Sequence, residues 1–268
     1  MSSQVIDIVI SGGFGRMGQA IQRLALQDTC FRITGLVESA ELVARHGNTV
    51  QTADGRQLPV ASYIHDLHPS AGSVLIEFTS PEATRKNAAE SAELGMKMVI
   101  GTTGLVGEPL EEIRSISKRT AVLAAPNMSV GINVLLGLAR KLSAALPDFD
   151  VEIIEAHHRH KKDAPSGTAL ALAGVVAEGR GTVPADVVRH GRSGIAGERP
   201  KGEIGVHAVR GGDIVGDHTV LFAGDGECIE LIHRANNRDT FAAGALRAAK
   251  FIARQQNGFF TMLDALGL

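Results

Sequence analysis

Cysteine is scarce in this chain, and neither sign of charge is in marked excess. The 268 residues include two cysteines, Cys30 and Cys228, and neither belongs to a CxxC pair. This spacing excludes a disulfide framework and a cysteine-based zinc motif, so both are interpreted as buried thiols in a reducing cytosol. The formal net charge of −2 provides no overall basic field that would attract nucleic acid or an anionic membrane.

A targeting segment and a membrane span are also missing from the pattern. The stretch MSSQVIDIVISG has no basic region or cleavage signal and runs straight into a strand-like segment, which predicts a cytoplasmic protein. The interval between Arg119 and Arg140 carries no charge, but Pro126-Asn127 divides it into a strand-like and a helix-like half. We therefore expect two buried elements in this interval and no membrane span.

The first half of the chain alternates between strand and helix patterns. Strand-like runs lie at 5–11, 31–38, 73–79, 97–104 and 120–126, and helix-like runs at 16–27, 81–94 and 108–119. This order is typical of βαβ units and predicts a Rossmann-type, doubly wound parallel sheet. Residues 40–72 are poorly patterned and predict only a weak helix, loops and a short strand.

The second half changes character. A helix (130–146), a strand (150–158) and a helix from about 166 to 179 precede strand-like runs at 203–210, 215–224 and 226–235, and a helix covers 241–255. The sequence AGDGE between the last two strands is a hairpin signal. We therefore predict an α/β chain with a dinucleotide-binding domain over 1–128 and an α+β domain with a largely antiparallel sheet over 129–238. Residues 239–268 are expected to pack back on the first domain.

The loop SGGFGRMG (11–18) lies directly between the first strand and the first helix. Gly13, Gly15 and Gly18 satisfy the dinucleotide fingerprint GxGxxG, and Gly12 offers a second register. A backbone without side chains and free helix amides can bind a pyrophosphate there. Glu38, twenty residues beyond Gly18, stands where a carboxylate accepts hydrogen bonds from an adenosine ribose. The alternatives are a glycine-rich turn without a ligand and a solvated carboxylate.

Other residues bear on the choice and placement of the cofactor. The Arg16 guanidinium could reach a 2′-phosphate and favours NADPH, whereas Glu38 favours the free ribose of NADH. The segments 101–104 and 125–127 end two later strands, where open α/β sheets bind ligands. They are candidates for the nicotinamide side of the site, with simple turn chemistry as the alternative.

The stretch EAHHRHKKDAPSGTAL (155–170) concentrates cationic side chains in one unbroken run over 157–162. A metal site is disfavoured because no cysteine lies nearby and the neighbouring charges are positive; a solvated basic turn is the other alternative. The run precedes Ser166, Gly167 and Thr168 at a helix start, where free N–H groups and a hydroxyl can hold an anion. Histidine and lysine can supply a proton and a fixed charge. The pattern predicts a carboxylate-bearing substrate that is protonated beside a nicotinamide.

These segments together resemble the 4-hydroxy-tetrahydrodipicolinate reductase (dihydrodipicolinate reductase) family of lysine and diaminopimelate biosynthesis. The resemblance rests on EAHHRHKKDAPSGTAL, GGFGRMG, IEFTSPEAT, VIGTTG, APNMSVGINV and VRGGDIVGDHTVLF, and it covers nearly the whole chain. It implies NAD(P)H-dependent reduction of a cyclic dicarboxylate to tetrahydrodipicolinate, by hydride transfer and protonation from His157 with Lys161 assisting. It also implies a cytoplasmic homotetramer built on the sheets of the second domain.

The resemblance assigns further roles residue by residue. Substrate carboxylates would be bound by His158, Gly167 and Thr168. The cofactor would be contacted by Gly12, Gly13, Phe14, Gly15, Arg16, Met17, Glu38, Gly101, Thr102, Thr103, Ala125, Pro126, Asn127 and Met128. One departure is Ser39, because family members that use both cofactors often have an arginine after the acidic residue. This favours use of NADH at least as well as NADPH.

Two other functions would share parts of this pattern. Another two-domain amino-acid dehydrogenase, such as a diaminopimelate or aspartate dehydrogenase, would have the glycine loop but would not explain segment 157–168. A regulatory protein that senses NAD(P) without turnover would need no proton donor.

Overall fold

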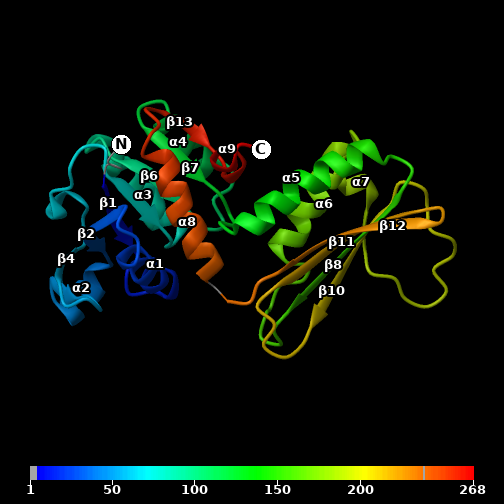
Figure 1. The fold of residues 1–268 in the computed structure, drawn as a ribbon, viewed down its shortest axis with the longest axis horizontal. Coiled ribbons are helices and arrows are strands. Elements are labelled where there is room, and N and C mark those ends of the chain that lie inside the picture. Colours follow the sequence, from blue (N-terminus) through cyan, green and yellow to red (C-terminus); the bar gives the residue numbers. More distant parts are fainter. Residues whose placement is uncertain (1–4, 238) are drawn as a thin grey trace. The chain divides into compact units, whose positions relative to one another are not determined.

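The computed structural model describes residues 5–237 and 239–268, which form two compact units (Figure 1). The first unit holds the described residues through Val130 together with the C-terminal stretch up to Gly267. The second unit holds Gly131–Asn237. The chain therefore leaves the first unit once and returns to it.

The first unit contains an eight-stranded sheet in the order β13-β7-β6-β5-β1-β2-β4-β3. Its strands are β1 (Ile6–Ser11), β2 (Phe31–Val37), β3 (Thr49–Gln51), β4 (Gln57–Ala61), β5 (Val74–Glu77), β6 (Lys97–Ile100), β7 (Ala121–Ala124) and β13 (Gly258–Phe260). All neighbours pair in parallel except β3 and β4. The central strands are apolar runs buried on both faces, as parallel sheets require. The predicted Rossmann-type sheet is confirmed.

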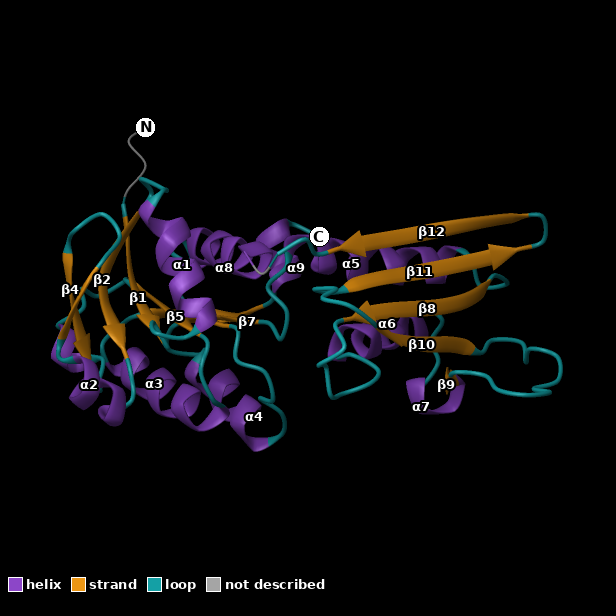
Figure 2. Cartoon of the chain, turned by 90° about the horizontal axis from the view of Figure 1, so that it is seen from below, coloured by secondary structure: helices purple, strands orange, loops and turns teal. Residues whose placement is uncertain are grey.

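Helices cover both faces of this sheet. They are α1 (Arg16–Leu26), α2 (Ala40–His46), α3 (Pro81–Glu93), α4 (Glu108–Ile116), α8 (Asp239–Ile252) and α9 (Met262–Leu266), with a 3₁₀ turn at His65–Leu67. Figure 2 shows α1 and α8 on one side of the strands and α2, α3 and α4 on the other. Ile21 of α1 and Ala245 of α8 share a core with Ile8, whereas Ala88 of α3 and Ile113 of α4 belong to the core on the opposite face.

The second unit has a five-stranded sheet in the order β12-β11-β8-β10-β9. Its strands are β8 (Asp150–His157), β9 (Val188–His190), β10 (Ile204–Arg210), β11 (Asp217–Gly224) and β12 (Glu227–Arg234). The long ladders β11–β12 and β11–β8 are antiparallel, which confirms the predicted character of the sheet. β10 is parallel to β8 and β9, so one edge is parallel. The last three long strands do not form a simple meander, because β8 lies between β10 and β11.

One face of this second sheet is covered by α5 (Val130–Ala145) and α6 (Gly167–Gly179), and the short α7 (Pro184–Val187) leads into β9. The core includes Leu135, Ile153, Leu172 and Phe222. On the opposite face, Ile154, Val209 and Ile232 are 40%, 48% and 49% exposed. We call this opposite face the open face of the sheet. In the part of the chain that the structure describes, no helix combines the length and apolar character needed to span a membrane.

Candidate active site

The glycine loop joins β1 to α1 as a tight turn. Gly12 has φ +74°, a left-handed conformation that favours glycine, and a Cβ at Gly18 would lie 2.2 Å from the Gly12 carbonyl oxygen. Gly15 is the N-cap of α1 and contributes no side-chain cap. Because the first N–H groups of a helix lack intrahelical acceptors, the backbone amides at the start of α1 suit a phosphate. The loop thus has the close packing and the bare helix end of a pyrophosphate site.

Glu38 follows β2 at the same edge of the sheet. Its Oε1 accepts the Phe14 N–H at 2.5 Å, so the carboxylate is fixed against the loop. A pocket of about 350 Å³ beside it is also lined by Ser39, Tyr63 and Lys86. The Lys86 ammonium lies 3.7 Å from the centroid of the Tyr63 ring. Tyr63 and Lys86 carry no motif and were not predicted from the sequence.

The segments predicted for the nicotinamide side also lie at this edge. Gly101–Thr103 follows β6, and Ala125–Met128 follows β7. Within them, the Thr102 hydroxyl accepts the Thr84 hydroxyl at 2.8 Å, and the Met128 side chain is 1% exposed in the core. These two side chains hold the turns in place. The loop, Glu38 and these turns together fit a dinucleotide, with a Cβ-free cradle for phosphates and a carboxylate for a ribose.

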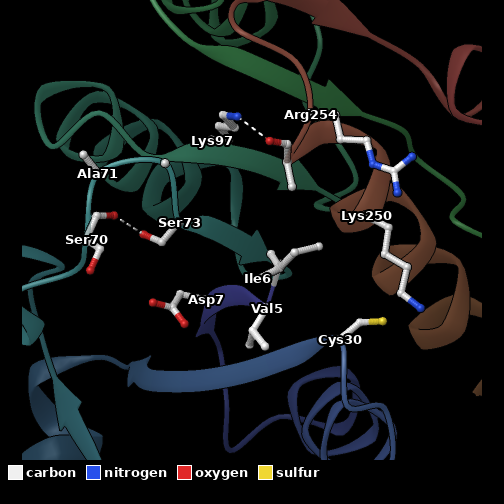
Figure 3. A pocket seen from close by; sticks show the side chains of 12 residues that line it. Val5, Ile6, Asp7, Cys30, Ser70, Ala71, Ser73, Lys97, Lys250 and Arg254 are labelled. Atoms are coloured by element: carbon white, nitrogen blue, oxygen red, sulfur yellow. Dashed lines mark hydrogen bonds between the residues drawn. The ribbon is translucent and has the colours of Figure 1, made fainter. Parts of the chain in front are cut away.

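A different pocket, of about 480 Å³, lies at the opposite edge of this sheet (Figure 3). It is lined by Ile6 and Lys97, which begin β1 and β6, by Ser73, which precedes β5, and by Lys250 of α8. Both ammonium groups have partners: Lys97 donates to the Ala253 carbonyl at 2.5 Å, and Lys250 pairs with Asp28 at 2.6 Å. Lys97 and Lys250 therefore stabilise the C-terminal end of α8. The glycine loop and Glu38, which suit a dinucleotide, lie at the carboxyl ends of the strands and not in this pocket.

His157, in the second unit, is the last residue of β8. Its Nδ1 lies 2.6 Å from Oε2 of Glu155, and its side chain is 12% exposed. The two residues are two apart in a strand and therefore project from the same face. Ring centroids of His157 and His218 are 5.2 Å apart in an edge-to-face arrangement.

Glu155 is fully buried and bound by three groups. Arg210 donates Nη1 and Nη2 to its two oxygens, each at 2.8 Å, and the backbone N–H of Ser166 donates to Oε1 at 3.0 Å. Burial raises the pKa of Glu155, but the bonds from Arg210, His157 and Ser166 outweigh burial and lower it on balance. An ionised carboxylate only accepts hydrogen bonds, so Nδ1 of His157 carries the proton between them.

His218 lies on the other side of this group. Burial, and then the charge of His157, lower its pKa to about 4, so the ring is neutral at pH 7. Its Nε2 is 3.1 Å from the Ser166 hydroxyl, which also caps α6 by accepting the Ala169 N–H at 3.2 Å.

The anion-binding site predicted from the sequence, which we call the anion seat, is the first turn of α6. Gly167 is exposed, and a Cβ added to it would meet nothing within 4 Å. Lys161 pairs with Asp163 at 2.9 Å and is 20% exposed. Nδ1 of His158 is buried, and among the described residues no group forms a hydrogen bond with it. The structure therefore brings His157, Lys161 and the start of α6 into one segment of the second unit.

The described residues contain no cluster of three or more His, Cys, Asp or Glu side chains arranged to hold a metal ion. The expectation that both cysteines are buried is wrong: both are free thiols, but Cys30 is half-buried and Cys228, in β12, is exposed.

Comparisons with known proteins identify the family. The model of the dihydrodipicolinate reductase N-terminus matches residues 6–128, and that of the C-terminus matches residues 131–266. The chain belongs to the dihydrodipicolinate reductase family. Its relatives include 4-hydroxy-tetrahydrodipicolinate reductases from Methanothermobacter thermautotrophicus, 44% identical over 98% of this chain and 100% of the relative, and from Rubrobacter xylanophilus, 47% identical over 98% of each. Dihydrodipicolinate reductases use NADH or NADPH, which accords with the Rossmann-type first unit.

Solved structures share this fold. A dipicolinate-bound dihydrodipicolinate reductase from Paenisporosarcina sp. TG-14 superposes with a TM-score of 0.78 at 24% identity, over 97% of this chain and 99% of that one. A diaminopimelate dehydrogenase from C. glutamicum superposes with a TM-score of 0.56 at 14% identity, over 98% and 94%. At these identities the likeness concerns the fold alone.

Three residues around His157 and the start of α6 were not predicted from the sequence: Glu155, His218 and Arg210. The contact between Ser166 and His218 was not predicted either. Glu155 could have been predicted, because it is two residues from His157 in a strand and both side chains therefore lie on one face. Arg210 and His218 could not, because only the pairing of β10 and β11 with β8 brings them next to His157 and Glu155.

Proposed function

We propose that this dihydrodipicolinate reductase family member reduces 4-hydroxy-tetrahydrodipicolinate to tetrahydrodipicolinate with NAD(P)H, in lysine and diaminopimelate biosynthesis. Loss of water from the substrate gives an unsaturated ring, which then gains one hydride and one proton. The observation that carries the proposal is a histidine bound to a buried carboxylate, which is itself bound to the N-cap residue of α6. An anionic substrate that needs a proton suits this arrangement.

The first unit would hold the cofactor through the loop from Gly12 to Met17, Glu38, the segment Gly101–Thr103 and the segment Ala125–Met128. When bound, the nicotinamide supplies the hydride. The N–H groups at the start of α1 would bind the pyrophosphate, and Glu38 would accept from a ribose hydroxyl. Because Ser39 and Glu38 line the ribose-side pocket, we propose that NADH serves at least as well as NADPH.

The second unit would bind the substrate and protonate it. Since Glu155 accepts from Nδ1 of His157, the proton to be donated is on Nε2. Lys161 would stabilise the anion that forms after hydride arrival. The carboxylates of the substrate would be bound by the N–H groups and hydroxyl of Gly167 and Thr168 and by His158, whose buried Nδ1 suits a ligand.

The test is the loss of reduced-nicotinamide absorbance with purified protein, with substrate generated in situ by the preceding synthase from pyruvate and aspartate semialdehyde. NADH and NADPH are run separately. We expect synthase-dependent oxidation that falls at least about 100-fold in His157→Gln and in Lys161→Met, since general acids contribute 10²–10⁴-fold. Oxidation that survives both substitutions would contradict the assigned roles. No oxidation by folded protein that binds NADH would refute the reductase function.

We also propose a cytoplasmic homotetramer assembled through the open face of the second sheet. The apolar side chains of Ile154, Val209 and Ile232 on this face support it, because exposed apolar patches mark interaction sites. Ile232→Asp should yield smaller species in sedimentation velocity. Leu138→Asp is the matched control, since Leu138 is 44% exposed but lies on α5. A monomeric wild-type mass, or equal loss of assembly in both variants, would contradict the proposal.

A further inference from the structure

We infer that Glu155 is the positioning residue of this site: it binds Nδ1 of His157, which leaves Nε2 to donate the proton, and it ties that ring to the first turn of α6. The inference rests on the proposed function, in which His157 donates the proton. Glu155 itself neither donates nor accepts the transferred proton.

The hydrogen bonds of Glu155 account for every acceptor site that its carboxylate offers. Oε1 accepts from Arg210 Nη2 at 2.8 Å and from Ser166 N at 3.0 Å. Oε2 accepts from Arg210 Nη1 at 2.8 Å and from His157 Nδ1 at 2.6 Å. A carboxylate has about four such sites. Since all are used and the side chain is 0% exposed, the carboxylate is held rigidly and is closed to solvent.

Orientation of the histidine follows from this saturation. With Nδ1–H committed to Glu155, the imidazolium can lose only its Nε2 proton, and the neutral ring that remains is the Nδ1–H tautomer. The same carboxylate also stabilises the imidazolium by its charge. Glu155 thus selects which nitrogen gives up its proton and favours the protonated ring before donation.

Two further contacts confine the ring. A Cβ at Gly216 would lie 3.0 Å from Nε2 of His157, so the backbone passes close to the reactive nitrogen. His218 stands edge-on to the ring, and its hydrogen bond with Ser166 leads to the N-cap of α6. Ser166 also donates its N–H to Glu155. Glu155 therefore holds both the proton donor, His157, and the residue that caps the anion seat.

The groups around His157 come from several elements. Glu155 of β8 is bound to its Nδ1, and Arg210 of β10 is bound to Glu155. His218 of β11 stands edge-on to the ring and is neutral at pH 7, and Lys161 of the basic turn adds positive charge near His218. Glu155 is the anion in direct contact with the His157 ring. Its neutralisation should therefore make protonation of His157 less favourable, so that activity is lost at lower pH.

The experiment compares wild type, Glu155→Gln and Glu152→Gln. Glu152 is the matched control, because it lies on the opposite face of the same strand and is also bound by arginines, at 2.7 Å and 3.0 Å. Nitrogen-15 NMR of the histidine rings, assigned with His157→Gln, reports the tautomer in the ligand-free protein. The pH profile of kcat, the KM for substrate and the Kd for dipicolinate are measured in parallel.

In wild type and Glu152→Gln we expect the neutral His157 ring as the Nδ1–H tautomer. In Glu155→Gln we expect the Nε2–H tautomer to appear, kcat to fall roughly 10²-fold or more, and the alkaline limb of the profile to move to lower pH. The inference is overturned by an Nε2–H tautomer in wild type, which needs no variant to fold. It is overturned as well by loss of activity in Glu155→Gln without a change in tautomer and pH limb, or by a changed tautomer with unchanged kcat. An inactive wild type with an Nδ1–H tautomer would instead reject the proposed function alone.

Discussion

Gly167 and Gly174 provide a paired test of where the substrate binds. Both lie in α6, neither has a positive φ, and a Cβ at either position would meet no atom of the chain within 4 Å. Alanine is therefore compatible with the fold at both. Only at Gly167, in the first turn, would the added methyl group stand where a substrate carboxylate is expected.

The magnitudes separate the two variants. Displacing a carboxylate from charge-assisted hydrogen bonds costs about 1.5–3 kcal/mol, or roughly a 10- to 150-fold loss of affinity. Gly174→Ala removes a glycine from a helix interior and should stabilise the protein by about 1 kcal/mol, or roughly 2–4 °C in Tm. For Gly167→Ala we expect a stability change within about 0.5 kcal/mol, because the site is exposed and terminal.

The assays are calorimetric titration with dipicolinate, KM for the substrate, and thermal unfolding. Gly167→Ala should weaken dipicolinate binding and raise KM with little change in Tm. Gly174→Ala should raise Tm and leave the dipicolinate affinity and KM unchanged. Unchanged affinity in Gly167→Ala would refute the assignment of this turn as the carboxylate seat. Equal weakening in both variants would show that α6 as a whole, and not its first turn, governs binding.

Other predictions concern the cofactor and stability. Glu38→Gln removes the charge that opposes a 2′-phosphate, so the NADPH to NADH ratio of kcat/KM should rise roughly tenfold, about 1.4 kcal/mol; an unchanged ratio would contradict this role. Gly18→Ala places a Cβ 2.2 Å from the Gly12 carbonyl oxygen, so the free energy of unfolding should fall by about 1–3 kcal/mol. The Tm of this variant should not rise when NADH is added. Burial raises the pKa of Glu152, but arginine and histidine partners lower it to about 2, below the ordinary 4.5. Its stabilisation is therefore complete above pH 4.5 and disappears as pH falls through 2. Denaturant titrations should show Glu152→Gln less stable than wild type at pH 7, with a difference that shrinks as pH falls towards 2 and is lost below it. Equal stability at pH 7 would count against the ion network.

The first half of the fold was accessible from sequence because its strands are continuous apolar runs. Ile8, Val9 and Ile10 are all fully buried, so the pattern of β1 directly reflects the sheet. Much of the segment 40–72 lacks such a run of buried apolar residues. Helix α2 has no buried residue, and β3 has none either, so neither shows a periodic apolar pattern in the sequence. In β4 only Leu58 and Val60 are buried. The strand β13 is three residues long, too short for a periodicity to be detected.

The candidate site contains residues that are contiguous in the sequence and residues that only the fold brings together. The glycine loop and the basic run are contiguous, and their chemistry could be inferred from residue types and order. Arg210 lies 55 positions from Glu155, and only the parallel pairing of β10 with β8 brings the two together. The order β12-β11-β8-β10-β9 depends on which strand edges remain available during folding, and sequence periodicity does not report that.

The return of the chain to its first unit has a consequence for synthesis on the ribosome. Ala242, Ala245 and Ala249 of α8 share the core of β1 and α1, and β13 extends the sheet beside β7. While the second unit emerges and folds, that face of the nascent first unit still lacks its covering helix. The second unit thus delays completion of the dinucleotide-binding unit until α8 and β13 are translated. Nascent chains stopped before α8 should expose an apolar surface that chaperones can bind.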